Sequence, residues 1–94
     1  QVPVVLDGFI AGAAALAAVG LQPRCRDYLI ASHQSVERGH QVILDHLALK
    51  PLLDLDLRLG EGTGACLGMS LVCASIKIYT EMATFGEAGV SEKA

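Results

Sequence analysis

The chain is organised around Arg58-Leu59-Gly60-Glu61-Gly62-Thr63-Gly64-Ala65, which joins an apolar extended segment to the longest helical pattern in the sequence. Glycine inside a strand or helix costs roughly 0.5–1 kcal/mol relative to alanine, so three glycines at alternate positions indicate a special backbone. Such spacing suits positive φ angles, close approach of a ligand, or bare N–H groups at a helix start. The carboxylate of Glu61, which lies between two glycines, is therefore the first candidate for chemistry.

The composition indicates a part of something larger. The chain has 94 residues, of which 52% are hydrophobic and only 18% are charged. A domain this small buries a limited share of its surface and cannot easily hide so many apolar side chains. Because a large exposed apolar surface usually marks a subunit or interdomain contact, we expect either an oligomer or a fragment of a longer protein.

Charge and composition also exclude several classes of function. A net charge of −3 without a Lys/Arg cluster argues against a nucleic-acid partner, which requires a basic face. The apolar run at residues 9–19 is too short for a membrane span, and no basic region precedes it, so we expect a cytoplasmic protein with no membrane partner. Three cysteines without CxxC spacing predict reduced thiols rather than a disulfide framework or a zinc site. His40 and His46 lie six residues apart, on different sides of a helix, so no metal site is expected.

Apolar runs and helical periodicity alternate along the chain. In the first half we expect a strand at 2–6, a helix at 9–19 capped by Gly20, a short turn or helix from Pro23, and a strand at 28–31. An amphipathic helix at 36–47, with Ser35 as its N-cap, and an extended segment at 52–59 follow. The last elements are a helix at about 63–85 with a possible break at 68–70, and a frayed tail at 86–94. We expect the first strand to be buried on both faces and the first helix nearly all round. This order predicts an α/β fold with a partial parallel sheet, of the Rossmann-like three-layer type.

Polar residues gather where each expected strand passes into the following helix. These places are Asp7-Gly8, residues 32–35 and residues 58–65. In open α/β sheets, ligands bind beyond the carboxyl ends of the strands. The sequence therefore predicts a single polar rim at one edge of the sheet.

Each polar residue of this rim admits two interpretations. Ser32 and Ser35 could hold a phosphate together with the N–H groups of a helix start, or they could only cap that helix. Arg58 could make a bidentate contact to the same anion, or it could pair with a nearby surface aspartate. Asp7 could accept a hydrogen bond from a substrate hydroxyl, or it could serve as a helix-start carboxylate. His33 is the only histidine well placed for catalysis, although a loop histidine is more often a hydrogen-bonded spectator.

Residues 60–65 formally match the dinucleotide-binding pattern G-x-G-x-x-G/A. Two features argue against that function: a glutamate inside the loop would repel a pyrophosphate, and no following strand carries a ribose-binding acid. A carboxylate among glycines fits general-base work better, because it can accept a proton from an incoming nucleophile. We interpret Glu61 as a general base on these grounds.

Several motifs occur together in a recognisable order. They are Val4-Val5-Leu6-Asp7-Gly8-Phe9, Tyr28-Leu29-Ile30-Ala31-Ser32-His33, Pro51-Leu52-Leu53-Asp54-Leu55, the 58–65 stretch, and an ending at 82–91. Over essentially the whole chain, they resemble the carboxyl-terminal part of the nicotinate-nucleotide–dimethylbenzimidazole phosphoribosyltransferase family. The chain departs from the usual family pattern at Cys66, Cys73 and Ser70, but not in the motif around Glu61.

The resemblance implies an enzyme of cobalamin assembly. It would move phosphoribose from nicotinate mononucleotide to 5,6-dimethylbenzimidazole with inversion at C1′ and release of nicotinate, using no metal or redox cofactor. By the same resemblance Glu61 is the general base that removes the azole proton. The substrate-binding residues that the resemblance implies are Ser35 and Arg58 near the phosphate, Asp7 near the ribose and Leu59 against the benzimidazole. From their positions in the sequence, we also expect Ser32 to help hold the anion in the same turn as Ser35, and Gly60 and Gly62 to make room for a flat ring.

The resemblance also implies a homodimer whose subunits combine an α/β domain with a small helical domain. Residues 1–69 would then belong to the α/β catalytic domain, and residues 70–94 to the small helical domain. Because the family's enzymes run to several hundred residues, we expect this chain to be inactive alone. The alternative, from a different functional class, is a non-catalytic nucleotide-binding, phosphate-binding or assembly module.

Overall fold

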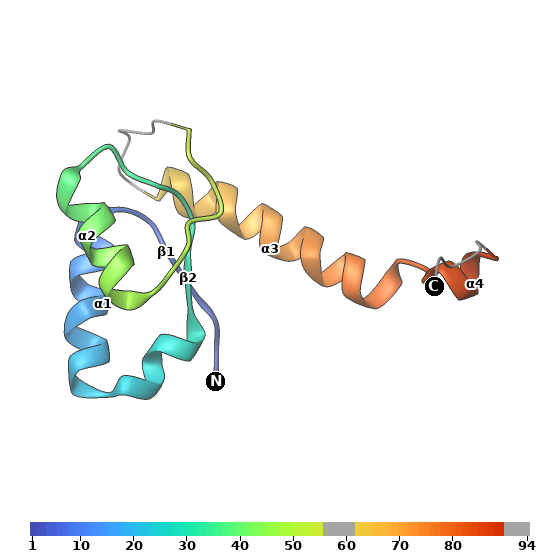
Figure 1. Ribbon diagram of the computed structural model, residues 1–94, viewed down its shortest axis with the longest axis horizontal. Coiled ribbons are helices and arrows are strands. Elements are labelled where there is room, and N and C mark those ends of the chain that lie inside the picture. Colours follow the sequence, from blue (N-terminus) through green and yellow to red (C-terminus); the bar gives the residue numbers. More distant parts are fainter. Residues whose placement is uncertain (56–61, 90–94) are drawn as a thin grey trace.

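The computed structural model describes residues 1–55 and 62–89 of the chain. Its elements, in order, are β1 (Val4–Leu6), α1 (Phe9–Leu21), the 3₁₀-helix η1 (Pro23–Tyr28), β2 (Leu29–Ala31), α2 (Arg38–Leu47), α3 (Thr63–Glu81) and α4 (Phe85–Ala88). Helices α1 and α2 pack together on one side of the strands, and the first turns of α3 lie on the other side (Figure 1). The predicted three-layer α/β arrangement is confirmed.

The sheet is parallel and short. Val4, Val5 and Leu6 of β1 lie opposite Leu29, Ile30 and Ala31 of β2, respectively. Beyond β2, a parallel bridge joins His33 to Leu53, and the Leu53 N–H donates to the Ser32 carbonyl at 3.0 Å. The described part of the predicted extended segment, residues 52–55, thus lies beside the continuation of β2 and forms one bridge there. Residues 56–59 of the predicted segment lie outside the described part.

The core lies between β1, α1 and α2. It is formed by Leu6, Ala15, Ile43 and Leu47, with Leu16, Val19, Leu29 and Leu49 packed around them. A fully buried aliphatic side chain contributes about 1.5–3 kcal/mol to stability, so each large buried side chain of this cluster contributes on that order. Gly12 lets α1 approach α2, because a Cβ there would lie 3.1 Å from the Ile43 side chain.

The burial predicted for the first strand and helix is wrong. Only Leu6 of β1 is buried, and in α1 only Gly12 and Ala15 are, whereas the Ile10 side chain is 84% exposed. The apolar composition of α1 matches a helix surrounded by protein, but among the described residues only one of its sides is covered. Helix α1 also runs to Leu21, with Gln22 rather than Gly20 at its C-cap, because the Gln22 N–H donates to the Ala18 carbonyl.

Helix α2 begins two residues later than predicted, and its N-cap is Glu37 rather than Ser35. The Ser35 hydroxyl instead accepts the Glu37 N–H at 3.2 Å, which fixes the turn before the helix. The predicted apolar face is confirmed, since Ile43 and Leu47 are buried and Gln41 and Asp45 are exposed. After the helix, the left-handed backbone at Ala48 (φ 54°) ends it.

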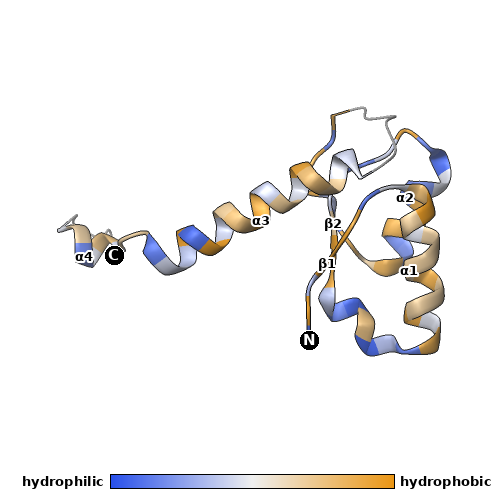
Figure 2. Ribbon diagram, turned by 180° about the vertical axis from the view of Figure 1, so that it is seen from behind, coloured by the Kyte–Doolittle hydropathy of each residue, from blue (hydrophilic) through white to orange (hydrophobic). Residues whose placement is uncertain are grey.

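Helix α3 is one continuous helix of 19 residues, so the possible break at 68–70 does not occur. Gly64 and Gly68, four residues apart, face the end of β2, and most other side chains of the helix are exposed. Its apolar surface continues away from the sheet (Figure 2). Helix α3 is long and apolar enough to cross a membrane, but core helices of soluble proteins meet the same criteria of length and composition.

The end of the chain differs from the prediction. The last long helix stops at Glu81 rather than near Phe85, and α4 follows it with a capping box between Thr84 and Glu87. The Thr84 hydroxyl accepts the Glu87 N–H at 3.1 Å, so residues 85–88 are helical rather than frayed. The predicted domain boundary between residues 69 and 70 lies inside α3 and stays a prediction, and residues 90–94 lie outside the described part.

Candidate functional site

The carboxyl ends of the strands meet the start of α3. Asp7 follows β1 directly, Ser32 and His33 follow β2, and residues 62–65 form the first turn of α3. Side-chain contacts of Asp7, Ser32 and His33 join all three places. The polar rim predicted from the sequence is therefore present for its described members.

The Asp7 carboxylate sits at the N-terminus of α3. Its Oδ2 accepts the Gly62 N–H at 3.2 Å and its Oδ1 accepts the Ala65 N–H at 3.1 Å. These are two of the N–H groups that have no partner within a helix, and the positive end of the helix dipole favours a negative charge there. Asp7 thus acts as a helix-start carboxylate, for α3, which lies 55 residues further along the chain. Its predicted contact with a ribose hydroxyl stays a prediction.

His33 lies buried between Asp7 and α3, with 2% of its surface exposed. Its Nε2 is 3.5 Å from Oδ1 of Asp7. Neither ring nitrogen has a hydrogen-bond partner among the described residues. The ring occupies the space that a side chain at position 64 would need, because a Cβ on Gly64 would lie 2.7 Å from Cγ of His33 and closer still to Cδ2 and Nε2.

Ser32 is fully buried, and its hydroxyl joins the two strand ends. Oγ donates to the Leu6 carbonyl at 2.5 Å and lies 3.3 Å from the Asp7 carbonyl. Its Cβ also faces Gly68, where an added Cβ would lie 2.7 Å away. These contacts give Ser32 a structural task at this edge, and its predicted contact with substrate stays a prediction.

Ser35 and His40 fix the turn that follows β2. The Ser35 N–H donates to Nδ1 of His40 at 2.8 Å, so this nitrogen carries no proton. Burial lowers the pKa of His40 below its usual value, and the nearby His33 acts in the same direction, whereas the Asp7 carboxylate opposes them. The neutral form that accepts this hydrogen bond is therefore the favoured one. The Ser35 hydroxyl is partly accessible at this edge, and its predicted phosphate contact stays a prediction.

Four of the predicted site residues lie outside the described part of the chain: Arg58, Leu59, Gly60 and Glu61. Gly62 is described and has a φ of 79°, in the left-handed region that favours glycine. This confirms the expectation of a positive φ angle for one glycine of the stretch. The predicted roles of Glu61 as base and of its neighbours as substrate contacts stay predictions.

Sequence reasoning missed the packing of His33 against Gly64. The available signal was the spacing of Gly64 and Gly68, which places two residues without side chains on one face of a helix. The sequence pattern alone assigns the glycines near Glu61 to ligand approach, whereas Gly64 makes room for a histidine of the chain itself.

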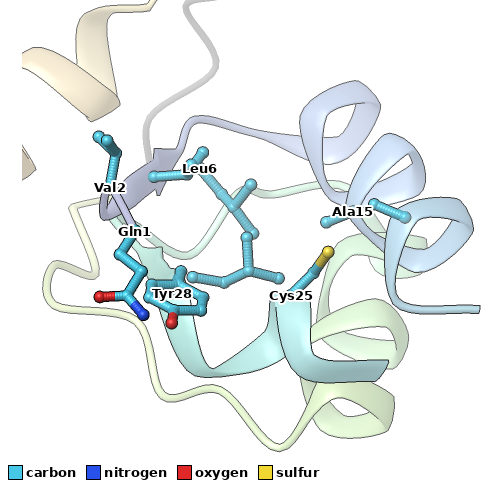
Figure 3. Close-up of a pocket in the computed structure, with 9 residues that line it drawn as sticks. Gln1, Val2, Leu6, Ala15, Cys25 and Tyr28 are labelled. Carbon is cyan, nitrogen blue, oxygen red and sulfur yellow. The ribbon is translucent and has the colours of Figure 1, made fainter. Parts of the chain in front are cut away.

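A separate apolar cavity of about 430 Å³ opens at the other end of the strands. Figure 3 shows the side chains that line it, among them Gln1, Val2, Leu6, Cys25 and Tyr28. The described residues around this cavity are mostly apolar, and they bring together no cluster of carboxylates, histidines or basic side chains. We therefore place the candidate site at the Asp7 edge.

Comparison with known proteins identifies the family. A sequence model described as "Phosphoribosyltransferase" matches residues 1–90. Nicotinate-nucleotide–dimethylbenzimidazole phosphoribosyltransferase from Desulforudis audaxviator is 65% identical over 92 residues, which are 98% of this chain and 26% of that protein. The enzyme of the same name from Chloroflexus aggregans is 67% identical over 93 residues, 99% of this chain and again 26% of that protein.

A solved structure agrees with the sequence comparisons. The crystal structure of the phosphoribosyltransferase of the same name from Thermus thermophilus matches with a TM-score of 0.90 and 56% identity. The match covers 97% of this chain and 27% of that one, so the chain spans about a quarter of the length of its relatives. Near-complete coverage at this identity confirms the resemblance carried by the strand-end motifs, and the chain belongs to the nicotinate-nucleotide–dimethylbenzimidazole phosphoribosyltransferase family.

Proposed function

We propose that the full-length protein containing this chain transfers phosphoribose from nicotinate mononucleotide to 5,6-dimethylbenzimidazole. The products are α-ribazole 5′-phosphate, the nucleotide of the lower cobalamin ligand, and nicotinate. The observation that carries the proposal is the identity of 65% over 98% of the chain to an enzyme named for these two substrates. Since the chain spans only 26% of that relative, it supplies one wall of the site and is inactive alone.

The described geometry is compatible with this chemistry. Asp7 holds the start of α3 at the carboxyl edge of the sheet, where α/β proteins bind nucleotides. The stretch with Glu61 leads directly into this helix start, since Gly62 follows Glu61 in the sequence. In the proposed reaction the carboxylate of Glu61 takes the azole N–H proton while the azole nitrogen bonds to C1′. The bond from C1′ to the nicotinate nitrogen breaks, and its electron pair leaves with nicotinate.

The proposal also covers the assembly and location of the full-length protein, which we propose to be a cytoplasmic homodimer. The exposed apolar side chains of α3, such as Leu71, Ile76 and Ile78, support burial by further protein in the full-length molecule.

The test is the replacement Glu61→Gln in the full-length protein. We expect kcat to fall by roughly 10²- to 10⁴-fold, the usual contribution of general acid–base catalysis. Binding of nicotinate mononucleotide, measured by calorimetric titration, stays close to that of the parent because the amide keeps the size of the side chain. Ribazole phosphate and nicotinate are quantified together by chromatography.

The matched control is Glu81→Gln, which removes an exposed carboxylate at the far end of α3. This variant keeps the parent rate. A Glu61→Gln enzyme that turns over as fast as the Glu81→Gln enzyme contradicts the role of Glu61. A parent protein that forms no ribazole phosphate from the two substrates contradicts the proposed function itself.

A further inference from the structure

The Asp7 carboxylate holds the start of α3 from outside the helix. Both oxygens of Asp7 are engaged, Oδ2 by the Gly62 N–H and Oδ1 by the Ala65 N–H. The Gly62 N–H belongs to the peptide bond that joins Gly62 to Glu61. A carboxylate that holds this N–H therefore holds the residue that directly follows the proposed base in the sequence.

Asp7 itself needs a support, because an aspartate side chain rotates about two bonds. Among the described residues, His33 is the one side chain within ion-pair distance of Asp7, because its Nε2 lies 3.5 Å from Oδ1 of Asp7. His33 contacts the same oxygen that accepts the Ala65 N–H. The ring thus lies where it can select the rotamer in which Asp7 faces the helix.

The surroundings of His33 are built to hold its ring at this place. The side chain is 2% exposed, and the missing side chain of Gly64 leaves the space that the ring fills. The centroid of the His40 ring lies 6.0 Å from that of His33. A buried imidazole whose two nitrogens lack hydrogen-bond partners in the described part of the chain is costly for a purely structural residue, since leucine or methionine would fill the same space without that penalty. The cost points to a task for the ring nitrogen that faces Asp7.

We propose that His33 is a positioning residue, which holds the Asp7 carboxylate against the first turn of α3 and so fixes Gly62, the residue that follows Glu61 in the sequence. His33 contacts neither substrate in this arrangement and acts only through Asp7. The kinetic part of the proposal rests on the proposed function, because that reaction supplies the rate to be measured. The structural part does not, because the anchoring of α3 can be measured without any substrate.

The experiment compares three replacements of His33 in the full-length protein. His33→Gln keeps a polar nitrogen near the place of Nε2, His33→Leu removes the nitrogen but retains bulk, and His33→Asn keeps an amide that is too short to reach Asp7. The control is His46→Leu, which changes an exposed histidine on α2. Hydrogen exchange of the amides at 62–65, read by mass spectrometry, reports the anchoring of α3. The rate of ribazole phosphate formation reports its consequence for the reaction.

We expect hydrogen exchange of the amides at 62–65 to be about tenfold faster or more in the leucine and asparagine variants. The reason is that the hydrogen bonds from Gly62 and Ala65 to the charged Asp7 carboxylate are weakened. Their kcat falls on the order of 10- to 100-fold, as for a small misplacement of reacting groups, while KM for both substrates changes little. The glutamine variant stays near the parent in both measurements. If His33→Leu does not fold, the comparison of asparagine with glutamine gives the same decision.

Two results overturn the proposal. The first is an equal loss in the glutamine and asparagine variants, which assigns His33 a packing role only. The second is unchanged exchange at 62–65 in the leucine or asparagine variant, whatever their activity. A parent protein without transferase activity contradicts the proposed function, and in that case the exchange measurement alone decides whether His33 anchors α3.

Discussion

The packing of Gly64 in α3 against the His33 ring predicts a large effect of a single methyl group. In the replacement Gly64→Ala, the new Cβ would lie 2.7 Å from Cγ of His33, with two further ring atoms closer. Non-bonded carbon atoms prefer about 3.5–4.0 Å, so the ring and the helix have to separate by roughly an ångström or more. The ring has little room to yield, because it is 2% exposed.

The magnitude follows from two opposing contributions. Overpacking of a buried site costs about 1–3 kcal/mol, and here it also strains the hydrogen bonds from Gly62 and Ala65 to Asp7. Alanine gains at most about 1 kcal/mol over glycine in a helix. We expect a net loss of about 2 kcal/mol in the free energy of unfolding. For a domain of 150–250 residues this corresponds to a fall in Tm of roughly 4–8 °C.

The assay is thermal unfolding of the full-length protein, followed by circular dichroism. Gly20→Ala is the matched control, because Gly20 lies in helix α1 and an added Cβ there meets nothing within 4 Å. This control variant should unfold at the parent temperature or slightly above it. A double replacement, His33→Ala with Gly64→Ala, should recover part of the loss, since the clashing ring is gone. If Gly64→Ala is as stable as Gly20→Ala, the packing described for His33 is wrong.

Two further replacements test this edge of the sheet. For Ser32→Ala we expect the free energy of unfolding to fall by about 1 kcal/mol, because the hydroxyl donates to the Leu6 carbonyl. The KM for nicotinate mononucleotide should not change. A raised KM with an unchanged Tm would assign Ser32 to substrate binding instead. For His40, whose lowered pKa means that the unfolded chain binds more protons, stability is fully present above pH about 6.5 and falls as the pH drops below it. His40→Asn keeps an acceptor for the Ser35 N–H, and its Tm should fall less than that of the parent between neutral and mildly acidic pH. The control His46→Asn, at an exposed position, should follow the parent. An equal dependence of Tm on pH in all three proteins would contradict the role of His40.

The order of strands and helices could be predicted because it depends on local patterns. The apolar run that ends at Asp7 and the amphipathic pattern before Leu47 each determine an element without help from distant residues. Helix ends were less predictable, since they depend on single hydrogen bonds. The Ser35 hydroxyl, for example, accepts the N–H of Glu37, so the helix begins after Glu37 rather than at Val36.

Burial and the contacts of the site could not be read from local patterns. The apolar α1 predicts a surrounded helix, yet among the described residues only one of its sides is covered. The partners of Asp7 are 55 and 58 residues away, and the space for His33 is provided by a glycine 31 positions later. Such pairs depend on the tertiary arrangement of the chain rather than on local sequence. The role of Glu61, by contrast, depends on the resemblance and on the chemistry of carboxylates.

The long span between Asp7 and Ala65 has a consequence for the order in which the molecule folds. Contacts close in sequence form first, because the entropy cost of closing a loop grows with its length. Strands β1 and β2, with helices α1 and α2, need only the first 47 residues, whereas α3 obtains its N-terminal anchor by closing a loop of 58 residues. We therefore expect the sheet edge to exist before α3 docks on it. Gly62, which follows the proposed base in the sequence, would then reach its final place only when α3 docks.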